Sequence, residues 1–221
     1  MIKMIPNMLT LGNLFCGSLA IISAVEGDFT RAFFLIIASA IFDFFDGFAA
    51  RLLNAYSPIG ADLDSLADLV SFGVAPAMIV YFMGLEHIGL LLALFAALRL
   101  AKFNVDTRQK DSFIGLPVPA NALLFASMGY IVQTQESLLA TFFTDSVVLC
   151  ILTVLFSYLM VSEIPMFSLK FKSWGFKQNA LVYTFLLVAF AAIVVFKIAA
   201  IPFVILAYVV VSILKSIFVK A

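Results

Sequence analysis

Residues 41–68 read as membrane-spanning sequence, yet they contain five aspartates, four of which form two spaced pairs: Asp43 with Asp46, and Asp64 with Asp68. An Asp at the centre of a membrane helix costs roughly 2.5 to 3.5 kcal/mol on insertion scales, so four of them need compensation. The first two are three residues apart and the last two are four apart, so each pair projects from one face of its own helix. We therefore expect two helices to meet in an oxygen-lined cation site.

The composition around this stretch is that of a membrane protein. Hydrophobic residues make up 64% of the 221 residues and charged residues only 12%, which lies outside the range of soluble domains. The formal net charge is zero, so nothing in the composition indicates nucleic-acid binding. We expect an all-α integral membrane protein, in which each span needs about 20 residues.

Apolar runs separated by polar or proline-containing breaks predict about eight transmembrane helices in a single polytopic domain. Pro6 suits the first turn of the first span, and Ser57-Pro58 separates the two spans that carry the aspartates. The expected spans cover residues 6–25, 30–53, 60–82, 87–103, 118–133, 146–161, 179–196 and 199–218.

Three regions are expected within this domain. Residues 1–165 form a six-helix catalytic core, and residues 179–221 add two C-terminal spans. Between them, residues 166–178 carry aromatic and basic side chains at helical spacing, which predicts an interfacial helix. Residues 135–145 read as a connection. Residues 1–9 lack the features of a cleavable signal, so we expect the first apolar run to stay as a helix.

The basic residues predict the orientation. With eight spans and a cytoplasmic N-terminus, 11 of the 13 lysines and arginines fall on the cytoplasmic side, and only Arg31 and Lys197 on the other. The C-terminus is then cytoplasmic as well. Asp43 lies eight residues before Arg51, about 12 Å along a helix. The aspartates should therefore face the cytoplasm from the cell (inner) membrane.

Carboxylates without neighbouring His or Cys favour Mg²⁺, Mn²⁺ or Ca²⁺. His87 is expected on the opposite side of the membrane. Two such ions about 3.5 to 4 Å apart clamp a pyrophosphate and stabilise the leaving phosphate. Four aspartates suffice for two ions while one carboxylate stays partly free as a base. Asp62 lies two positions before Asp64 and points roughly 160° away from it, so its role stays open.

Gly47, Gly60 and Arg51 suit the phosphates of a nucleotide. A glycine lets phosphates approach the helix backbone closely, and an arginine offers a two-pronged fork to phosphate oxygens. Helix packing is the alternative for the glycines, and an interfacial anchor is the alternative for the arginine.

This spacing resembles the signature of the CDP-alcohol phosphotransferases, integral membrane enzymes of phospholipid synthesis. The matching positions are Asp43, Asp46, Gly47, Ala50, Arg51, Gly60, Asp64 and Asp68. The resemblance implies that Asp43, Asp46 and Asp64 are metal ligands. It implies that Asp68 lies near the metals and deprotonates the acceptor hydroxyl. The other four positions would line the cytidine diphosphate site, and the enzyme would be a homodimer.

Further segments between residues 6 and 120 resemble the phosphatidylserine synthase branch of this family. They are residues 6–10, 13–17, 65–76, 98–105 and 115–117. The resemblance implies CDP-diacylglycerol and L-serine as substrates and CMP as the leaving group. Lys102 departs from it, because that branch often carries Arg at this position; the charge is kept but the fork is lost.

The acceptor alcohol does not follow from the signature. Serine carries a carboxylate, and Arg99 and Lys102 are the nearest candidate cations for it, with positive-inside anchoring as the alternative. Asn7 and Thr10 are candidates to hydrogen-bond cytidine or phosphate, or else they cap and pack the first span.

Two other interpretations remain. The same chemistry with glycerol phosphate or inositol phosphate as acceptor predicts a further basic cluster, which the sequence does not clearly contain. A cation- or proton-coupled secondary transporter also carries intramembrane aspartates, at the midplane of broken helices in two related halves. Here the aspartates cluster at one end of adjacent spans and no internal repeat is visible.

Overall fold

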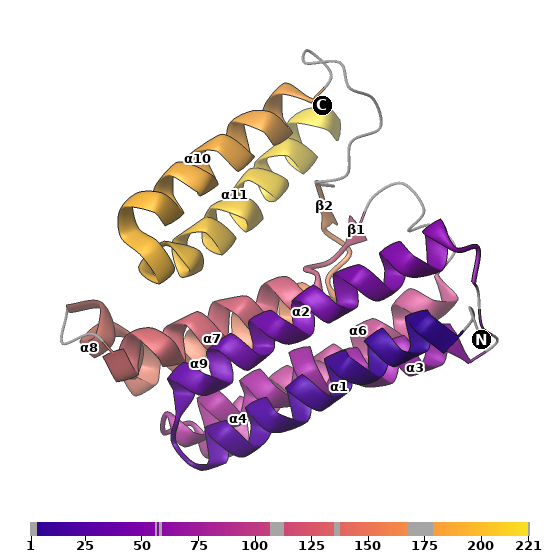
Figure 1. Ribbon diagram of the computed structural model, residues 1–221. Coiled ribbons are helices and arrows are strands. Elements are labelled where there is room, and N and C mark those ends of the chain that lie inside the picture. Colours follow the sequence, from indigo (N-terminus) through magenta and orange to yellow (C-terminus); the bar gives the residue numbers. More distant parts are fainter. Residues whose placement is uncertain are drawn as a thin grey trace.

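The computed structural model describes residues 4–55, 57, 59–106, 113–134, 138–167 and 179–220. Within these residues the chain is all-α, as predicted, apart from two strands of two residues each (Figure 1). The helical elements are α1 (Met4–Val25), α2 (Phe29–Leu52), α3 (Gly60–Asp68), η1 (Leu69–Val74), α4 (Ala75–Phe82), α5 (Glu86–Gly89), α6 (Leu91–Val105), α7 (Val118–Thr134), α8 (Leu138–Thr144), α9 (Ser146–Val161), α10 (Ala180–Phe196), η3 (Lys197–Ala200) and α11 (Ile201–Lys220).

Five helical stretches in the described residues are long and apolar enough to cross a membrane. A sixth is added if α8 and α9, which meet at 70°, count as one bent span. The sequence predicts eight, and the numbers differ in two places. The 17 residues of α7 extend only about 25 Å. Ala180–Ile217 counts as one stretch, although it folds back at η3 into a hairpin (Figure 1). The chain is a multi-pass membrane protein, and the number eight stays a prediction.

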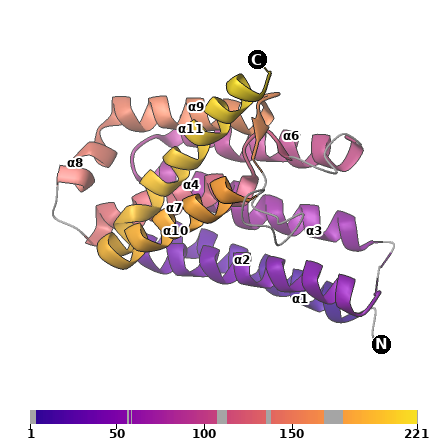
Figure 2. The same cartoon turned by 90° about the horizontal axis from the view of Figure 1, so that it is seen from above.

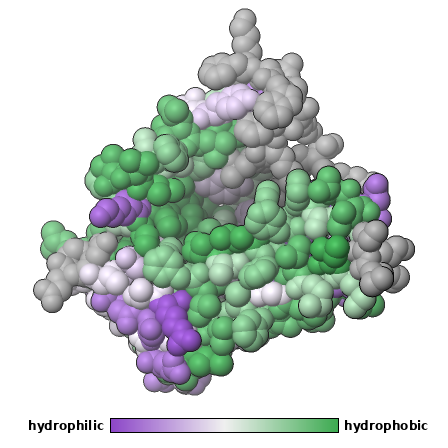
Figure 3. Space-filling model, in the orientation of Figure 1, coloured by the Kyte–Doolittle hydropathy of each residue, from purple (hydrophilic) through white to green (hydrophobic). Residues whose placement is uncertain are grey.

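Apolar side chains dominate the outer surface of the molecule. Phe15, Leu94 and Val195 each expose more than half of their surface, and many other large apolar residues do the same. Figure 3 shows this on one face, where hydrophobic residues cover most of the helices and hydrophilic ones gather toward the edges. So large an apolar surface is unfavourable in water, and it suits the acyl chains of a bilayer.

The long helices up to α9 form a bundle with roughly aligned axes, and the short helix α8 turns away at one end (Figures 1 and 2). α1 and α2 pair as a hairpin, and the segment α3–η1–α4 lies along α1. α6 packs on η1 and on α9, while α7 contacts α2 and α4. Phe33, Phe72 and Phe125 fill the interior and are almost completely buried. The segment that carries the second aspartate pair therefore lies between α1 and α6.

A π-helical segment interrupts the third span. The sequence predicts an unbroken helix over residues 60–82, but η1 separates α3 from α4. Pro76 explains the interruption, because its nitrogen has no hydrogen to donate to the carbonyl four residues earlier. The backbone N–H of Ala75 instead reaches the carbonyl of Val70, five residues back. The extra residue in this turn changes how the faces of α3 and α4 align.

Two elements correct the sequence-based expectation. Residues 135–145, predicted to be a connection, contain the helix α8. A short antiparallel pair joins β1 (Phe113–Ile114) to β2 (Pro165–Met166), where none is predicted. Neither element is long enough to show a hydrophobic period, and the strand pair forms only because folding brings distant segments together.

The hairpin of α10 and α11 lies across one side of the bundle, where α11 contacts α7 (Figure 2). Tyr208 Oη on α11 donates a hydrogen bond of 2.9 Å to the carbonyl of Phe167. The N–H of Phe167 donates to Ser212 Oγ at 3.4 Å. Phe167 directly follows β2, so α11 is fastened to the strand pair. Residues 168–178, most of the predicted interfacial helix, lie outside the described residues.

Small and polar residues join α1 to its neighbours. The backbone carbonyl of Asn13 accepts hydrogen bonds from Ser39 Oγ on α2 and from Ser71 Oγ on η1, each 3.1 Å long. A Cβ added to Gly17 would lie 2.1 Å from Ser71 Oγ. Small residues at contacts between membrane helices allow such close approach of their backbones.

We expect Gly17→Ala to lower the free energy of unfolding by about 1 to 3 kcal/mol, because the new methyl group displaces Ser71. Thermal unfolding in detergent micelles should show this as a fall in Tm of at least about 2 °C. Gly47→Ala is the matched control, since its Cβ would meet no atom closer than 3.5 Å. Equal Tm values for the two variants would contradict this account of the contact.

Candidate active site

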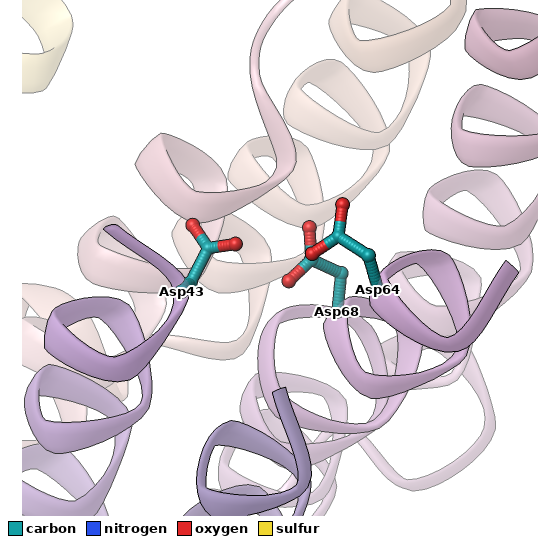
Figure 4. A group of neighbouring side chains, drawn as sticks. All are labelled: Asp43, Asp64 and Asp68. Atoms are coloured by element: carbon teal, nitrogen blue, oxygen red, sulfur yellow. The ribbon is translucent and has the colours of Figure 1, made fainter. Parts of the chain in front are cut away.

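Three of the four predicted aspartates meet in space. Asp43 projects from α2, and Asp64 and Asp68 project from α3 toward it (Figure 4). One carboxylate oxygen from each lies within 4.8 Å of those from the other two. None of the three side chains is exposed. The i, i+4 spacing on α3 thus brings two carboxylates to one face of the helix, as the sequence predicts.

Carboxylates this close cannot all stay charged without a partner. Two unit charges 4.8 Å apart repel by about 3.5 kcal/mol at an effective dielectric constant of about 20. In addition, Asp64 Oδ1 is buried and has no hydrogen-bond partner. Hard divalent cations take carboxylate oxygens as ligands, so this group of donors fits such an ion.

Asp46 occupies a different position from the other three. It follows Asp43 by one helical turn and is only 6% exposed. Its Oδ2 accepts a hydrogen bond of 2.7 Å from Thr10 Oγ1 on α1. Asp46 is not among the three carboxylates that meet within 4.8 Å, but together with Asp64 it lines an adjoining cavity. Asp46 therefore belongs to the wall of the cavity beside the carboxylate cluster.

The cavity has a volume of about 210 Å³ and lies among α1, α2, α3 and the connection between α2 and α3. Its lining residues are Pro6, Asn7, Thr10, Asp46, Gly47, Ala50, Ala55, Ser57, Gly60, Ala61 and Asp64. Apart from Arg51, every residue that the sequence assigns to the nucleotide belongs to this lining. The structure thus brings together residues that are up to 58 positions apart, among them the carboxylates of Asp46 and Asp64.

Packing does not explain the two glycines of the cavity. A Cβ on Gly47 would lie 3.5 Å from its nearest neighbour, Arg51 Nη1. A Cβ on Gly60 would lie 3.5 Å from Ser57 Cβ and 3.6 Å from Asn7 Oδ1. These are ordinary van der Waals contacts, so the protein itself has room for a methyl group at both positions. This favours the close approach of a ligand over helix packing, the two alternatives that the sequence leaves open.

Arg51 lies beside the cavity, in the last turn of α2. Its side chain is exposed, and its guanidinium is the group nearest to Gly47. Asn7 Nδ2, on the other side, donates a hydrogen bond of 3.3 Å to Ser57 Oγ in the connection between α2 and α3. Polar groups from two helices thus surround the glycines.

Asn13 is a site residue to which the sequence assigns no role. It is fully buried on α1, and its Nδ2 donates a hydrogen bond of 3.0 Å to Asp68 Oδ1. The amide oxygen of the same side chain is buried without a partner. One signal could have indicated it, because an amide in the middle of a membrane helix is rarely placed there without a function.

The two basic residues predicted for the acceptor differ in the structure. Arg99 on α6 is 7% exposed, and its Nε donates a hydrogen bond of 3.1 Å to the carbonyl of Leu116. Its Nη2 is buried without a hydrogen-bond partner. Lys102, one turn further on, is half-buried and forms an ion pair with Glu163. The structure therefore leaves a donor available on Arg99, whereas Lys102 is engaged at the surface.

Comparisons with known proteins identify the family of this chain. A family model described as CDP-alcohol phosphatidyltransferase matches residues 3–159. The CDP-diacylglycerol–serine O-phosphatidyltransferase of Bacillus subtilis (strain 168) is 43% identical over 167 residues, covering 72% of this chain and 88% of the relative. The protein of the same name from Helicobacter pylori (strain ATCC 700392 / 26695) is 38% identical over 194 residues, covering 84% and 81%. The archaetidylserine synthase of Methanothermobacter thermautotrophicus is 33% identical over 168 residues, covering 72% and 68%.

The family match spans more than half of the 221 residues and includes every aspartate of the cluster and every residue of the cavity. The hairpin of α10 and α11 lies beyond it. The chain belongs to the CDP-alcohol phosphatidyltransferase family.

Proposed function

We propose that this protein transfers the phosphatidyl group of CDP-diacylglycerol to the hydroxyl group of L-serine, which yields phosphatidylserine and CMP. The observation that carries the proposal is the meeting of Asp43, Asp64 and Asp68 beside a cavity lined by the other signature residues. Relatives named as serine phosphatidyltransferases support serine as the acceptor.

Asp43, Asp64 and Asp68, with Asp46 beside them, would hold Mg²⁺ or Mn²⁺, and four carboxylates are enough for two ions. The donor set supports this, because it offers only hard oxygen ligands and includes the unpartnered Asp64 Oδ1. When bound, the ions neutralise the phosphates and the charge that builds up on the leaving group. Thr10 keeps Asp46 in place through its hydrogen bond.

The nucleotide would bind in the 210 Å³ cavity. Gly47, Ala50 and Gly60 allow the phosphates to approach the helix backbones, and Arg51 at the cavity's edge can bind phosphate through two hydrogen bonds. The hydroxyl of Thr10 already donates to Asp46. We therefore assign its contribution to that carboxylate, and leave Asn7 as the candidate for direct contact with the nucleotide.

Asp68 acts as the general base in this proposal. It takes the proton of the serine hydroxyl, and the oxygen attacks the phosphorus that carries diacylglycerol. A new P–O bond to serine forms, the bond to the oxygen of CMP breaks, and CMP leaves with the electron pair. Asn13 donates to one oxygen of Asp68, which leaves the other oxygen for the incoming hydroxyl.

The membrane arrangement belongs to the same proposal. We infer eight spans with both termini in the cytoplasm, since this topology puts 11 of 13 basic residues on that side. The active site then faces the cytoplasm from the cell (inner) membrane. In this proposal the catalytic core is residues 1–165, and residues 179–221 add two spans. We also propose a homodimer, as the family resemblance implies.

The test of the function is an acceptor panel. Purified protein in detergent, with CDP-diacylglycerol and Mn²⁺ or Mg²⁺, is expected to release CMP and form labelled lipid with serine. It should not do so with glycerol phosphate or inositol phosphate, because the described residues near Asp68 include no second basic cluster for another phosphate. Transfer to inositol phosphate or glycerol phosphate without transfer to serine would replace serine as the acceptor while keeping the chemistry.

The carboxylate cluster makes a separate prediction. Asp43→Asn, Asp64→Asn and Asp68→Asn should each lower kcat at least about 100-fold, because each removes a metal ligand or the base. Asp62→Asn is the matched control on the same helix, and its exposed side chain should leave kcat within about threefold. EDTA should abolish CMP release, and added Mn²⁺ or Mg²⁺ should restore it. Full turnover in EDTA would exclude the metal site.

The two glycines of the cavity, Gly47 and Gly60, lead to a prediction about substrate binding. Gly47→Ala and Gly60→Ala should raise the KM for CDP-diacylglycerol at least about tenfold, because a methyl group then occupies space needed by the phosphates. The KM for serine and the Tm should change little, since neither methyl group meets a protein atom closer than 3.5 Å. An unchanged KM for CDP-diacylglycerol in both variants would return these glycines to a purely structural role.

A further inference from the structure

Two buried polar atoms without partners belong to the two helices that flank the segment carrying Asp68. One is Oδ1 of Asn13, a hydrogen-bond acceptor, and the other is Nη2 of Arg99, a charged donor. Asn13 comes from α1 and Arg99 from α6, and the segment α3–η1 that carries Asp68 packs between these helices (Figure 2). Buried polar atoms are normally paired, so two unpaired atoms beside one catalytic carboxylate indicate a ligand with complementary groups.

The orientation of Asn13 is set by its surroundings. Its backbone carbonyl accepts hydrogen bonds from Ser39 and Ser71, which hold this turn of α1 against α2 and η1. Its Nδ2 donates to Asp68 Oδ1 at 3.0 Å. The amide oxygen belongs to the same planar group, so it lies beside the carboxylate and is left as an acceptor. A donor that binds Asn13 Oδ1 is therefore held next to the general base.

Arg99 is held equally firmly. Its Nε donates to the carbonyl of Leu116 at 3.1 Å, and its guanidinium carbon lies 5.2 Å from the centre of the Phe103 ring. These contacts fix the plane of the guanidinium and leave Nη2 as a buried donor. Along α6, Ala96 lies against Gly73, and Asn104 Nδ2 donates a hydrogen bond of 2.9 Å to Ser65 Oγ. Arg99 lies between these two contacts on α6, as Asp68 does on the facing segment, so the two residues lie at the same level. An anionic group on Nη2 would thus sit close to Asp68.

We propose that these two atoms form a site for a zwitterionic amino acid, in which Arg99 Nη2 binds the α-carboxylate and Asn13 Oδ1 accepts a hydrogen bond from the α-ammonium group. Serine carries both groups on the carbon that bears its hydroxymethyl group, so engaging both directs the hydroxyl toward Asp68. The inference rests on the proposed transfer to serine and adds the groups that select it. Lys102 is not part of this site, because it is paired with Glu163.

Two analogues of serine test the two contacts separately. Ethanolamine lacks the carboxylate, and 3-hydroxypropionate lacks the ammonium group, while both keep the hydroxyl. The measurement is kcat/KM for CMP release by the full-length, metal-loaded protein with CDP-diacylglycerol. In the wild type, kcat/KM for each analogue should be at least about 100-fold lower than for serine, because each analogue leaves one buried group of the protein unpaired.

Variants should then remove one preference each. Arg99→Met should lower the preference for serine over ethanolamine at least about tenfold and leave the preference over 3-hydroxypropionate within about threefold. Asn13→Ala should instead lower the preference for serine over 3-hydroxypropionate and leave the preference over ethanolamine nearly unchanged. Each variant also loses overall activity, since Arg99 and Asn13 lie beside Asp68. A purely structural defect, however, lowers kcat/KM for all three substrates by the same factor and leaves the preferences unchanged. If Arg99→Met fails to fold, Arg99→Lys serves, because an ammonium group cannot bind Leu116 and a carboxylate in the same geometry.

Lys102→Met is the matched comparison, as it removes the other predicted cation one turn away on the same helix. It should leave both preferences unchanged. A loss of the preference over ethanolamine in Lys102→Met but not in the Arg99 variants would overturn the site, and so would unchanged preferences in the variants of both Arg99 and Asn13. A wild-type protein that does not use serine at all would refute the proposed function, and this site with it.

Discussion

Mutual repulsion among three carboxylates is the constraint around which the helices of this fold are arranged. Asp43, Asp64 and Asp68 bring oxygens within 4.8 Å of one another in a bundle whose other interior residues are mainly apolar. The two helices that carry them must be held together against this repulsion until a cation balances it. Between helices in lipid, apolar contact gives little net attraction, so close packing and hydrogen bonds have to supply it.

Helix α1 provides most of that support. The carbonyl of Asn13 accepts hydroxyl hydrogens from Ser39 on α2 and Ser71 on η1, and Gly17 lets the backbones of α1 and η1 approach. Thr10 holds Asp46 from the same face of α1. A helix without any acidic residue therefore sets the spacing of the carboxylates, and its polar side chains reach the site as well.

The elements beyond the family match are connected to the acceptor side of the site. Tyr208 and Ser212 on α11 bind the backbone of Phe167, which follows β2. β2 pairs with β1, and two residues after β1 the carbonyl of Leu116 accepts the Nε of Arg99. The hairpin of α10 and α11 thus stabilises the segment that orients Arg99, which gives these helices a physical link to the chemistry in addition to their place in the membrane.

Much of the fold could be predicted because membrane spans carry a strong local signal, namely long apolar runs with polar or proline breaks. The predicted limits of the helix over residues 146–161 are those of α9, and those of the first two spans differ from α1 and α2 by only one or two residues. The interruption at η1 was missed because its cause, Pro76, also fits the interior of a kinked span. The helix α8 and the strand pair were missed because they are too short to show a period.

The sequence by itself determined which carboxylates share a helix face and which residues belong to the signature, because both follow from spacing along one helix. Only the tertiary structure decided that three of the four aspartates meet while Asp46 turns to Thr10. It also distinguished Arg99 from Lys102 and brought Asn13 to Asp68. These outcomes depend on which side chains from distant helices become neighbours and take up the available hydrogen bonds, and spacing within one helix carries no information about that.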